Sequence, residues 1–396
     1  MGEQALRAEV RSALSALLRP KASDAAFSFL GAGQDDVEAG RVLLATLAEG
    51  GWSVPTWPAA WGGRDATPEE AAIVGQELAR FDVPDLYPFM VGLALVGPTL
   101  LTHGSALQLE RWLPSIASGA EIWCQLFSEP DAGSDLAALS CRAVRDGDMW
   151  RITGQKVWSS RAHYSRWGLL LARTDPDVPK HAGITAFALE MSAPGVDVRP
   201  LRQMNGDTHF NEVFMTDAVV PDTDRVGDVG DGWRVAITTL MHERGALGPG
   251  GGPGRRELID LVRRAGSADD PLVRARAAGV VAELEVGRLT NLRAREARRA
   301  GRPPGPEGSG AKLRGAAAIK ALADLAVDVE GLGGLIASAG EDEWLTLFLT
   351  APSISIRGGT DEIQRNILGE RVLGLPPEPR PDKGVPFKEV PRSAPS

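Results

Sequence analysis

The hydrophobic pattern of this chain changes period twice, and this division limits the folds that it can adopt. Residues 1–120 and 231–375 place apolar residues at helical spacing, whereas residues 121–230 contain short runs rich in Val, Ile, Phe, Thr and Trp between Gly, Pro and Asp turns. The 396 residues exceed the roughly 250–300 at which one core usually stops growing. We therefore predict an α+β multidomain fold with two helical domains, a mostly antiparallel β domain between them, and a flexible Pro-rich tail at 376–396.

Composition and local patterns exclude several classes of protein. The 43 basic and 52 acidic side chains give a net charge of −9, which argues against a nucleic-acid partner. Cys124 and Cys141 are too few for a disulfide framework and lack the spacing of a metal site. The longest apolar run, residues 87–101, is too short to span a bilayer, and the first residues do not resemble a signal peptide. We expect a metal-free enzyme in the reducing cytoplasm.

Two segments of the β domain could contact a cofactor. In CQLFSEPDAGSDLA (124–137), a strand leads into a turn where residues 132–134 offer consecutive N–H groups and a hydroxyl, a geometry that holds anionic oxygens. An ordinary loop fits this segment equally well. In GQKVWSS (154–160), Trp158 followed by two serines could provide a stacking wall and hydrogen-bond donors for a planar cofactor, or Trp158 could be a core residue.

The helical segments supply a cap and a candidate catalytic carboxylate. Thr67, before Pro68 and two glutamates, predicts the N-cap of a helix. In TTLMHERGALG (238–248), Glu243 lies four residues after Thr239 and edges an apolar helix face. A solvated surface glutamate is the ordinary interpretation of such a residue, and a catalytic base is the alternative.

Seven segments of the chain, in the same order as in the family, resemble the acyl-CoA dehydrogenase flavoproteins. They are GWSVPTWPAAWGG, LVGPTLLTHGS, WCQLFSEPDAGSDLA, GQKVWSS, LRQMNGDTHFNEVFMTDAVVP, GWRVAITTLMHERGALG and GGTDEIQRNILGERVLGLP. The resemblance covers nearly the whole chain. It implies an N-terminal helical domain (1–120), a middle β-barrel (121–230) and a C-terminal four-helix bundle (231–375), with FAD between the last two domains and a homotetramer or dimer as the assembly.

The resemblance also assigns residues to the cofactor and to the substrate. Trp158 would pack against the flavin ring, the Ser160 hydroxyl would lie near flavin N5, and the Gly358 N–H would point at the thioester carbonyl. Two further positions, in EGLGG (330–334), fall where a neighbouring subunit would touch the cofactor. The implied FAD contacts are Gln125, Leu126, Phe127, Ser128, Gly133, Ser134, Trp158, Ser159, Ser160, Glu330, Gly334, Thr360 and Glu362, and the implied substrate contacts are Ser134, Arg244, Gly358 and Gly359.

The family's chemistry suggests a role for Glu243. Members remove the α-proton of an acyl-CoA while the β-carbon gives a hydride to flavin N5, which forms the trans-2-enoyl-CoA. Many members place the base immediately before the Gly-Thr of the active-site loop, where this chain has Gly358. A smaller branch, which includes isovaleryl-CoA and long-chain enzymes, places it on the first helix of the C-terminal domain, and Glu243 matches that position.

The resemblance further implies a role in lipid metabolism through fatty-acid β-oxidation, with an electron-transfer flavoprotein as the acceptor. Two alternatives are an acyl-CoA oxidase that uses O₂ and a partner subunit of a heteromeric dehydrogenase. The family's RxxFG segment, which reaches the partner's FAD, is missing, and Arg274 and Arg276 are candidates to replace it. Arg357, on the active-site loop where a small or apolar residue is expected, suggests a polar or bulky acyl group, or altered chemistry.

Overall fold

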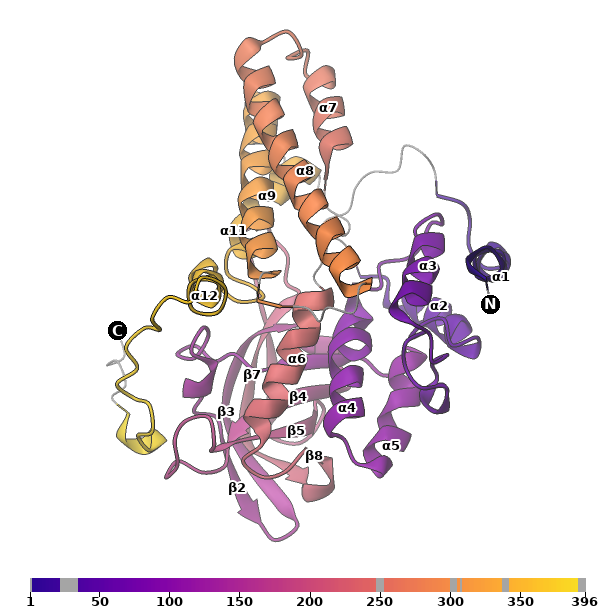
Figure 1. The fold of residues 1–396 in the computed structure, drawn as a ribbon. Helices are drawn as coiled ribbons and strands as arrows, with labels where there is room; N and C mark the ends of the chain where they lie inside the picture. The colour runs from indigo at the N-terminus through magenta and orange to yellow at the C-terminus, as the bar shows by residue number, and fades with distance from the viewer. Residues whose placement is uncertain are drawn as a thin grey trace.

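The chain folds as helices, then a sheet, then helices, as the sequence predicts (Figure 1). The structure is a computed structural model, and it describes residues 2–21, 35–246, 253–299, 305–306, 308–336 and 342–390. A body formed by the first helices and the sheet carries a long arm of C-terminal helices (Figure 1). None of the helices in these described ranges is long and apolar enough to cross a membrane.

The N-terminal part is helical, and its third helix begins at the predicted cap. Thr67 Oγ1 accepts a hydrogen bond from Glu70 N at 3.2 Å, and Glu70 Oε2 accepts one from Thr67 N at 2.9 Å, so the cap is confirmed as a capping box. A π-helical turn, Val91–Val96, continues into α4. The helices of this part are α1 (Glu3–Ser15), α2 (Val37–Glu49), α3 (Pro68–Leu78), α4 (Gly97–His103) and α5 (Ala106–Ala117).

The middle part is a single mixed sheet with strand order β6-β7-β3-β2-β4-β5-β8, and β1 pairs with β4 in parallel. Most of the other pairings are antiparallel. The end strands β6 and β8 are not paired with each other in the described part of the chain, so the predicted barrel is an open, curled sheet. Its strands are β1 (Trp123–Leu126), β2 (Arg142–Asp146), β3 (Met149–Ser160), β4 (Trp167–Arg173), β5 (Ile184–Glu190), β6 (Val196–Leu201), β7 (Phe210–Pro221) and β8 (Arg225–Val226).

The strands β4 and β5 are buried on both faces. All seven residues of β4 are buried, and successive residues point to opposite faces. Leu169 and Leu171 pack with the N-terminal helices, whereas Leu170 joins the interior of the curled sheet with Phe187. This explains why WGLLLAR and ITAFALE are almost continuously apolar instead of alternating.

The C-terminal helices divide between the body and the arm. Helix α6 (Gly232–Ala246) packs against β5 and α4, and its Val235 and Ala236 belong to the same core as the N-terminal helices. The four-helix arm is instead built from α7 (Arg255–Arg264), α8 (Pro271–Arg299), α9 (Gly308–Glu330) and α11 (Glu343–Ile354), around a core of its own (Figure 1). The short helices α10 (Leu332–Ile336) and α12 (Asp361–Ile367) pack against α9.

Residues 382–390, within the predicted flexible tail, contact the β4–β5 loop. Phe387 is 5% exposed, and the guanidinium of Arg173 lies 3.5 Å from its ring centroid. Lys180 Nζ contacts Asp382 at 2.6 Å, and Lys388 Nζ contacts Asp177 at 2.6 Å. The Pro-rich composition suggested disorder, but one aromatic anchor and these ion pairs fix the segment on the β4–β5 loop. Residues 391–396 of the predicted tail lie outside the described residues.

Substitution of the anchor should release this segment. We expect Phe387→Ala to raise the rate of tryptic cleavage at Lys383 and Lys388 on the order of tenfold, because cleavage follows the population of the undocked segment. Leu375→Ala is the matched control, since Leu375 is 56% exposed. Equal cleavage rates in wild type and Phe387→Ala, measured by mass spectrometry of a time course, would contradict the anchoring role.

Candidate active site

The turn after β1 is compact, and the residues after it are open. Glu129 and Ala132 exchange two backbone hydrogen bonds of 3.1 Å each. Ala132 is buried, whereas Gly133 and Ser134 are exposed, and a Cβ built on Gly133 would meet no atom within 4 Å. Leu126 and Phe127 pack in the two cores, so a cofactor could contact them only through their backbone. The exposed pair after the turn and the half-buried Gln125 and Ser128 leave room for a ligand.

The end of β3 turns Trp158 outward. Its pairing with β7 shifts register between Lys156 and Ser159, and Trp158 has a φ of 60° and is 60% exposed. The alternative of a core tryptophan is therefore wrong. The bulge leaves most of Trp158 exposed, and its ring meets that of Phe210 in a T-shaped arrangement with centroids 5.8 Å apart.

A planar polar cofactor fits these two segments. Ser159 is fully buried, and its Oγ has no hydrogen-bond partner among the described residues. A buried hydroxyl without a partner is costly unless a ligand or water satisfies it. Val157 N donates to Ser128 O at 2.9 Å, so the turn after β1 lies beside the residue that precedes Trp158. An exposed aromatic face and polar groups next to it suit a flavin ring.

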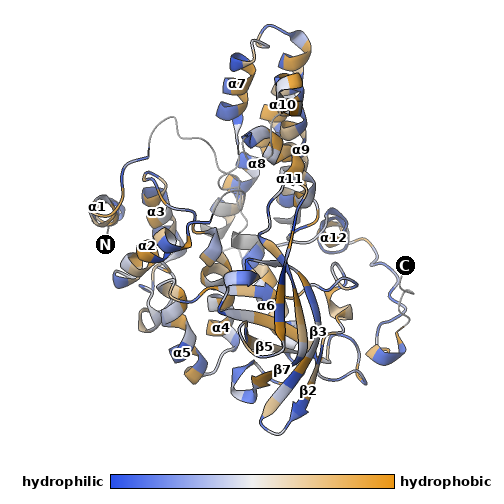
Figure 2. Cartoon of the chain, turned by 180° about the vertical axis from the view of Figure 1, so that it is seen from behind, coloured by the Kyte–Doolittle hydropathy of each residue, from blue (hydrophilic) through white to orange (hydrophobic). Residues whose placement is uncertain are grey.

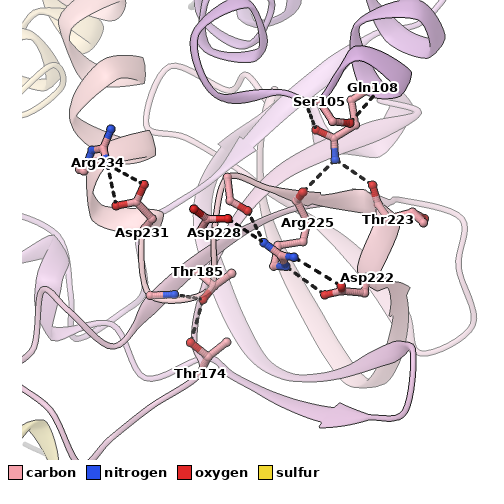
Figure 3. Close-up of polar contacts among 12 residues, drawn as sticks. Ser105, Gln108, Thr174, Thr185, Asp222, Thr223, Arg225, Asp228, Asp231 and Arg234 are labelled. Carbon is pink, nitrogen blue, oxygen red and sulfur yellow. Dashed lines mark hydrogen bonds and ion pairs between the residues drawn. The ribbon is translucent and has the colours of Figure 1, made fainter.

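The start of α6 is fixed by polar contacts with the sheet (Figure 3). Gly230 N donates to Thr185 Oγ1 at 2.9 Å, and Thr185 Oγ1 lies 2.8 Å from Thr174 Oγ1. Asp231 pairs with Arg234 at 3.1 Å in the first turn of the helix. Gln108 of α5 donates to two carbonyls beside β8, those of residues 223 and 225, at 2.8 Å each. The bond from Gly230 to Thr185 anchors the backbone just before α6 to β5, and Glu243 lies near the other end of this helix.

Glu243 extends the face of α6 that packs on α4. Thr239 is fully buried, and its Oγ1 lies 3.0 Å from Thr99 Oγ1. Residues four apart on a helix share a face, so Glu243, which is half-buried, follows Thr239 along this contact. The side chain of Arg244 and residues 247–252 lie outside the described part of the structure.

The loop before α12 is held in a conformation that favours glycine. Gly358 and Gly359 have φ values of 66° and 87°. The Gln364 amide donates to both carbonyls, at 3.1 and 3.3 Å, and Thr360 caps α12 by accepting from Ile363 N at 3.3 Å. Glu362 is exposed. Position 358 is a glycine and so offers no carboxylate, and glycine adopts its φ of 66° without strain.

A charged cluster follows Ser160. Of its residues, only Arg357 was predicted from the sequence to lie at the site. Arg161 is 2% exposed and donates from Nε and Nη2 to Asp35 at 2.8 and 2.7 Å, while its guanidinium lies 4.4 Å from the centroid of the Tyr87 ring. Burial lowers the pKa of Arg357, and nearby Tyr87 opposes that effect. Two guanidiniums therefore lie near one tyrosine. The only signal in the sequence was the position of Arg161 directly after Ser160.

Glu330 and Gly334 lie far from Trp158 within this chain. Glu330 ends α9, and Gly334 is in α10 at the tip of the arm, away from the sheet (Figure 2). Burial, and the Asp342 carboxylate, raise the pKa of Glu330. The predicted contact of these two positions with a neighbouring subunit's cofactor stays a prediction. Across the described ranges, no group of three or more His, Cys, Asp and Glu residues could hold a metal ion.

The exposed Trp158 on the sheet and Glu243 on the first C-terminal helix are the parts of a candidate site for a planar cofactor and its substrate. Sequence models of the acyl-CoA dehydrogenase N-terminal, middle and C-terminal domains match residues 2–120, 124–218 and 230–373. The chain belongs to the acyl-CoA dehydrogenase family, whose members are flavin-dependent oxidoreductases that act on acyl-CoA.

Two relatives come from Mycobacterium tuberculosis. The acyl-CoA dehydrogenase FadE34 is 44% identical over 83% of this chain, and the match spans 45% of FadE34. The chain thus covers about half the length of that relative. The acyl-CoA dehydrogenase IpdE1 is 43% identical, over 84% of this chain and 87% of IpdE1.

Two solved structures share the fold. A steroid acyl-CoA dehydrogenase named Tcur3481-Tcur3483 superposes with a TM-score of 0.80 at 30% identity, covering 95% of this chain and 98% of that one. The ChsE4-ChsE5 complex from Mycobacterium tuberculosis gives 0.74 at 29% identity, with the same coverage of 95% and 98%.

The histidine beside the charged cluster gives a pH-dependent prediction. Burial, and next the Arg161 charge, lower the pKa of His209 from 6.5 to about 4. The folded protein keeps this ring neutral where the unfolded chain protonates it, so stability is lost as the pH falls from about 6.5 to about 4. In thermal denaturation, His209→Gln should show a shallower fall of the midpoint over this range than wild type. Parallel curves would show that His209 titrates normally in the folded protein.

Proposed function

We propose that this chain dehydrogenates an acyl-CoA thioester between its α- and β-carbons, with Glu243 as the base that removes the α-proton. The single observation that carries the proposal is the position of Glu243. It lies on the same face of α6 as Thr239, and this face packs against α4. Position 358, where many members carry their base, is a glycine with a φ of 66°. Glu243 itself is half-buried on this face.

The residues proposed to hold FAD lie on two adjacent segments of the sheet and on the loop before α12. The 60% exposure of Trp158 and the Ser159 Oγ, which has no hydrogen-bond partner among the described residues, support this assignment. When bound, FAD supplies the acceptor for the hydride from the β-carbon. The proposed contacts are Gln125, Leu126, Phe127, Ser128, Gly133, Ser134, Trp158, Ser159, Ser160, Thr360 and Glu362, with Glu330 and Gly334 contributed to a neighbouring subunit.

The active-site loop is proposed to activate the thioester. The Gly358 N–H would donate to the thioester oxygen, and this bond would strengthen as negative charge develops during loss of the α-proton. The two bonds from the Gln364 amide hold the loop backbone in place for that role. Ser134, Gly359 and Arg244 complete the proposed substrate contacts.

We further propose that the acyl group is bulky and bears oxygen, in place of a simple fatty acyl chain. The similarity to a structure named as a steroid acyl-CoA dehydrogenase supports a ring-containing group. The cluster of Arg161, Tyr87 and Arg357 supports polar substituents, because one nitrogen of the buried Arg161 guanidinium, Nη1, has no hydrogen-bond partner among the described residues.

A second candidate function is that of one subunit in a heteromeric dehydrogenase. This function is favoured by the similarity to a structure described as the ChsE4-ChsE5 complex. The arm exposes large apolar side chains that a partner could cover, namely Leu272, Leu289, Leu332, Ile336 and Phe348. The partner would be a paralogous chain or a second copy of this one. Electron transfer to an electron-transfer flavoprotein, and not to O₂, is part of the proposal.

Removal of the proposed base should abolish turnover while FAD stays bound. We expect Glu243→Gln to lower kcat by about 10²- to 10⁴-fold, the usual contribution of acid–base catalysis. The control is Glu110→Gln, which changes an exposed carboxylate on α5. Single-turnover bleaching of the flavin measures the step directly. A Glu243→Gln variant with wild-type kinetics would remove this residue from the mechanism.

A panel of thioesters should reveal the substrate class. Added anaerobically, CoA esters of ring-containing, oxygen-bearing acids should bleach the flavin faster than butyryl- or palmitoyl-CoA, and admitted air should restore the colour slowly. Fast reoxidation would indicate an oxidase.

A colourless protein that turns yellow only when coexpressed with a paralogue would favour the heteromeric function.

A further inference from the structure

Two opposite charges lie buried between the proposed flavin segments. Lys156, on β3, is 0% exposed, and Glu129, in the turn after β1, is 6% exposed. Lys156 Nζ donates to Glu129 Oε1 at 2.8 Å and to Phe127 O at 2.9 Å. Burial of two charges is expensive, and an apolar pair of similar volume is often as stable. Stability alone therefore does not explain the choice of these residues.

Glu129 is held in its ionised form by a complete set of donors. Ser140 donates from N at 2.7 Å and from Oγ at 3.0 Å, and Cys141 N donates at 2.9 Å. Burial acts to raise the pKa of Glu129, but the Lys156 charge and these N–H groups outweigh burial, so the pKa lies below its ordinary value. The carboxylate is thus a fixed anchor for the lysine.

The contacts of the pair join the turn after β1 to β3 just before the bulge. Phe127 O and Glu129 bond Lys156, and Ser128 O accepts from the next residue, Val157, at 2.9 Å. Three consecutive residues of the turn are therefore tied to two consecutive residues of β3. Immediately beyond these ties lie Trp158, with its left-handed backbone, and Ser159.

We propose that the Lys156–Glu129 ion pair is a positioning device that fixes the two flavin-binding segments, 125–128 and 158–160, relative to each other. This inference rests on the proposed FAD site. Lysine suits the task because its ammonium has three donors, enough to hold a backbone carbonyl and a carboxylate together. A methionine of similar length would fill the space and leave the Phe127 carbonyl without this donor.

The test compares FAD release from the full-length holoprotein, followed by the rise in flavin fluorescence on dilution. Lys156→Met should raise the Kd for FAD at least tenfold and lower the thermal midpoint, because it leaves the Glu129 charge buried without its partner. The double variant Lys156→Met with Glu129→Gln removes both charges. It should recover most of the thermal midpoint and still bind FAD at least tenfold more weakly than wild type.

A matched buried carboxylate serves as the control. Glu77 of α3 is 1% exposed and pairs with Arg7 and Arg11 at 3.0 and 2.9 Å, within the N-terminal helices. Glu77→Gln should lower the thermal midpoint and leave the Kd for FAD within twofold of wild type. A double variant at positions 129 and 156 that binds FAD within twofold of wild type would overturn the positioning role. A wild-type protein that binds no FAD, either alone or when coexpressed with a paralogue, would instead overturn the proposed function.

Discussion

The double burial of β4 and β5 is the constraint on which the rest of the structure depends. One face of these strands packs with the N-terminal helices and α6, and the other fills the curled sheet. Because successive side chains point to opposite faces, a one-residue slip would exchange the two cores. The parallel pairing of β1 with β4 then fixes where β1 ends, and with it the turn at residues 127–132. The packing of this core therefore determines where the candidate cofactor segments lie.

The body and the arm have separate cores, and the candidate base belongs to the body. Helix α6 shares its core with α4 and α5, whereas α7 to α9 and α11 enclose their own apolar residues. The Gly-Pro-rich stretch at 248–254 separates the two sets in the sequence. As a result, the position of Glu243 relative to the sheet depends on the contacts at the start of α6 and not on the packing of the arm. The arm's exposed apolar residues can then serve assembly.

Local patterns in the sequence were sufficient to predict the elements, but not the contacts between distant segments. Thr67 and Glu70 form a cap within one turn, which confirms that prediction, and the helical spacing predicted for residues 231–375 is confirmed by the long helix α8 (Pro271–Arg299). The Arg161–Asp35 pair joins residues 126 positions apart, and the docking of Phe387 on Arg173 joins segments more distant still. Nothing in the composition of either segment indicates its partner. The exposure of Trp158 depends on a register shift against β7, which a single strand cannot reveal.

Two buried ion pairs of this protein each join two backbone segments near Trp158. Lys156 and Glu129 join β3 to the turn after β1, and Arg161 and Asp35 join the end of β3 to the segment before α2. Both cations flank Trp158 and its two serines along the chain. An apolar contact tolerates small shifts, whereas a desolvated ion pair with directional hydrogen bonds does not. The bulge at Trp158 is therefore held from both sides by interactions that oppose displacement, which is the property that a site for a rigid planar cofactor requires.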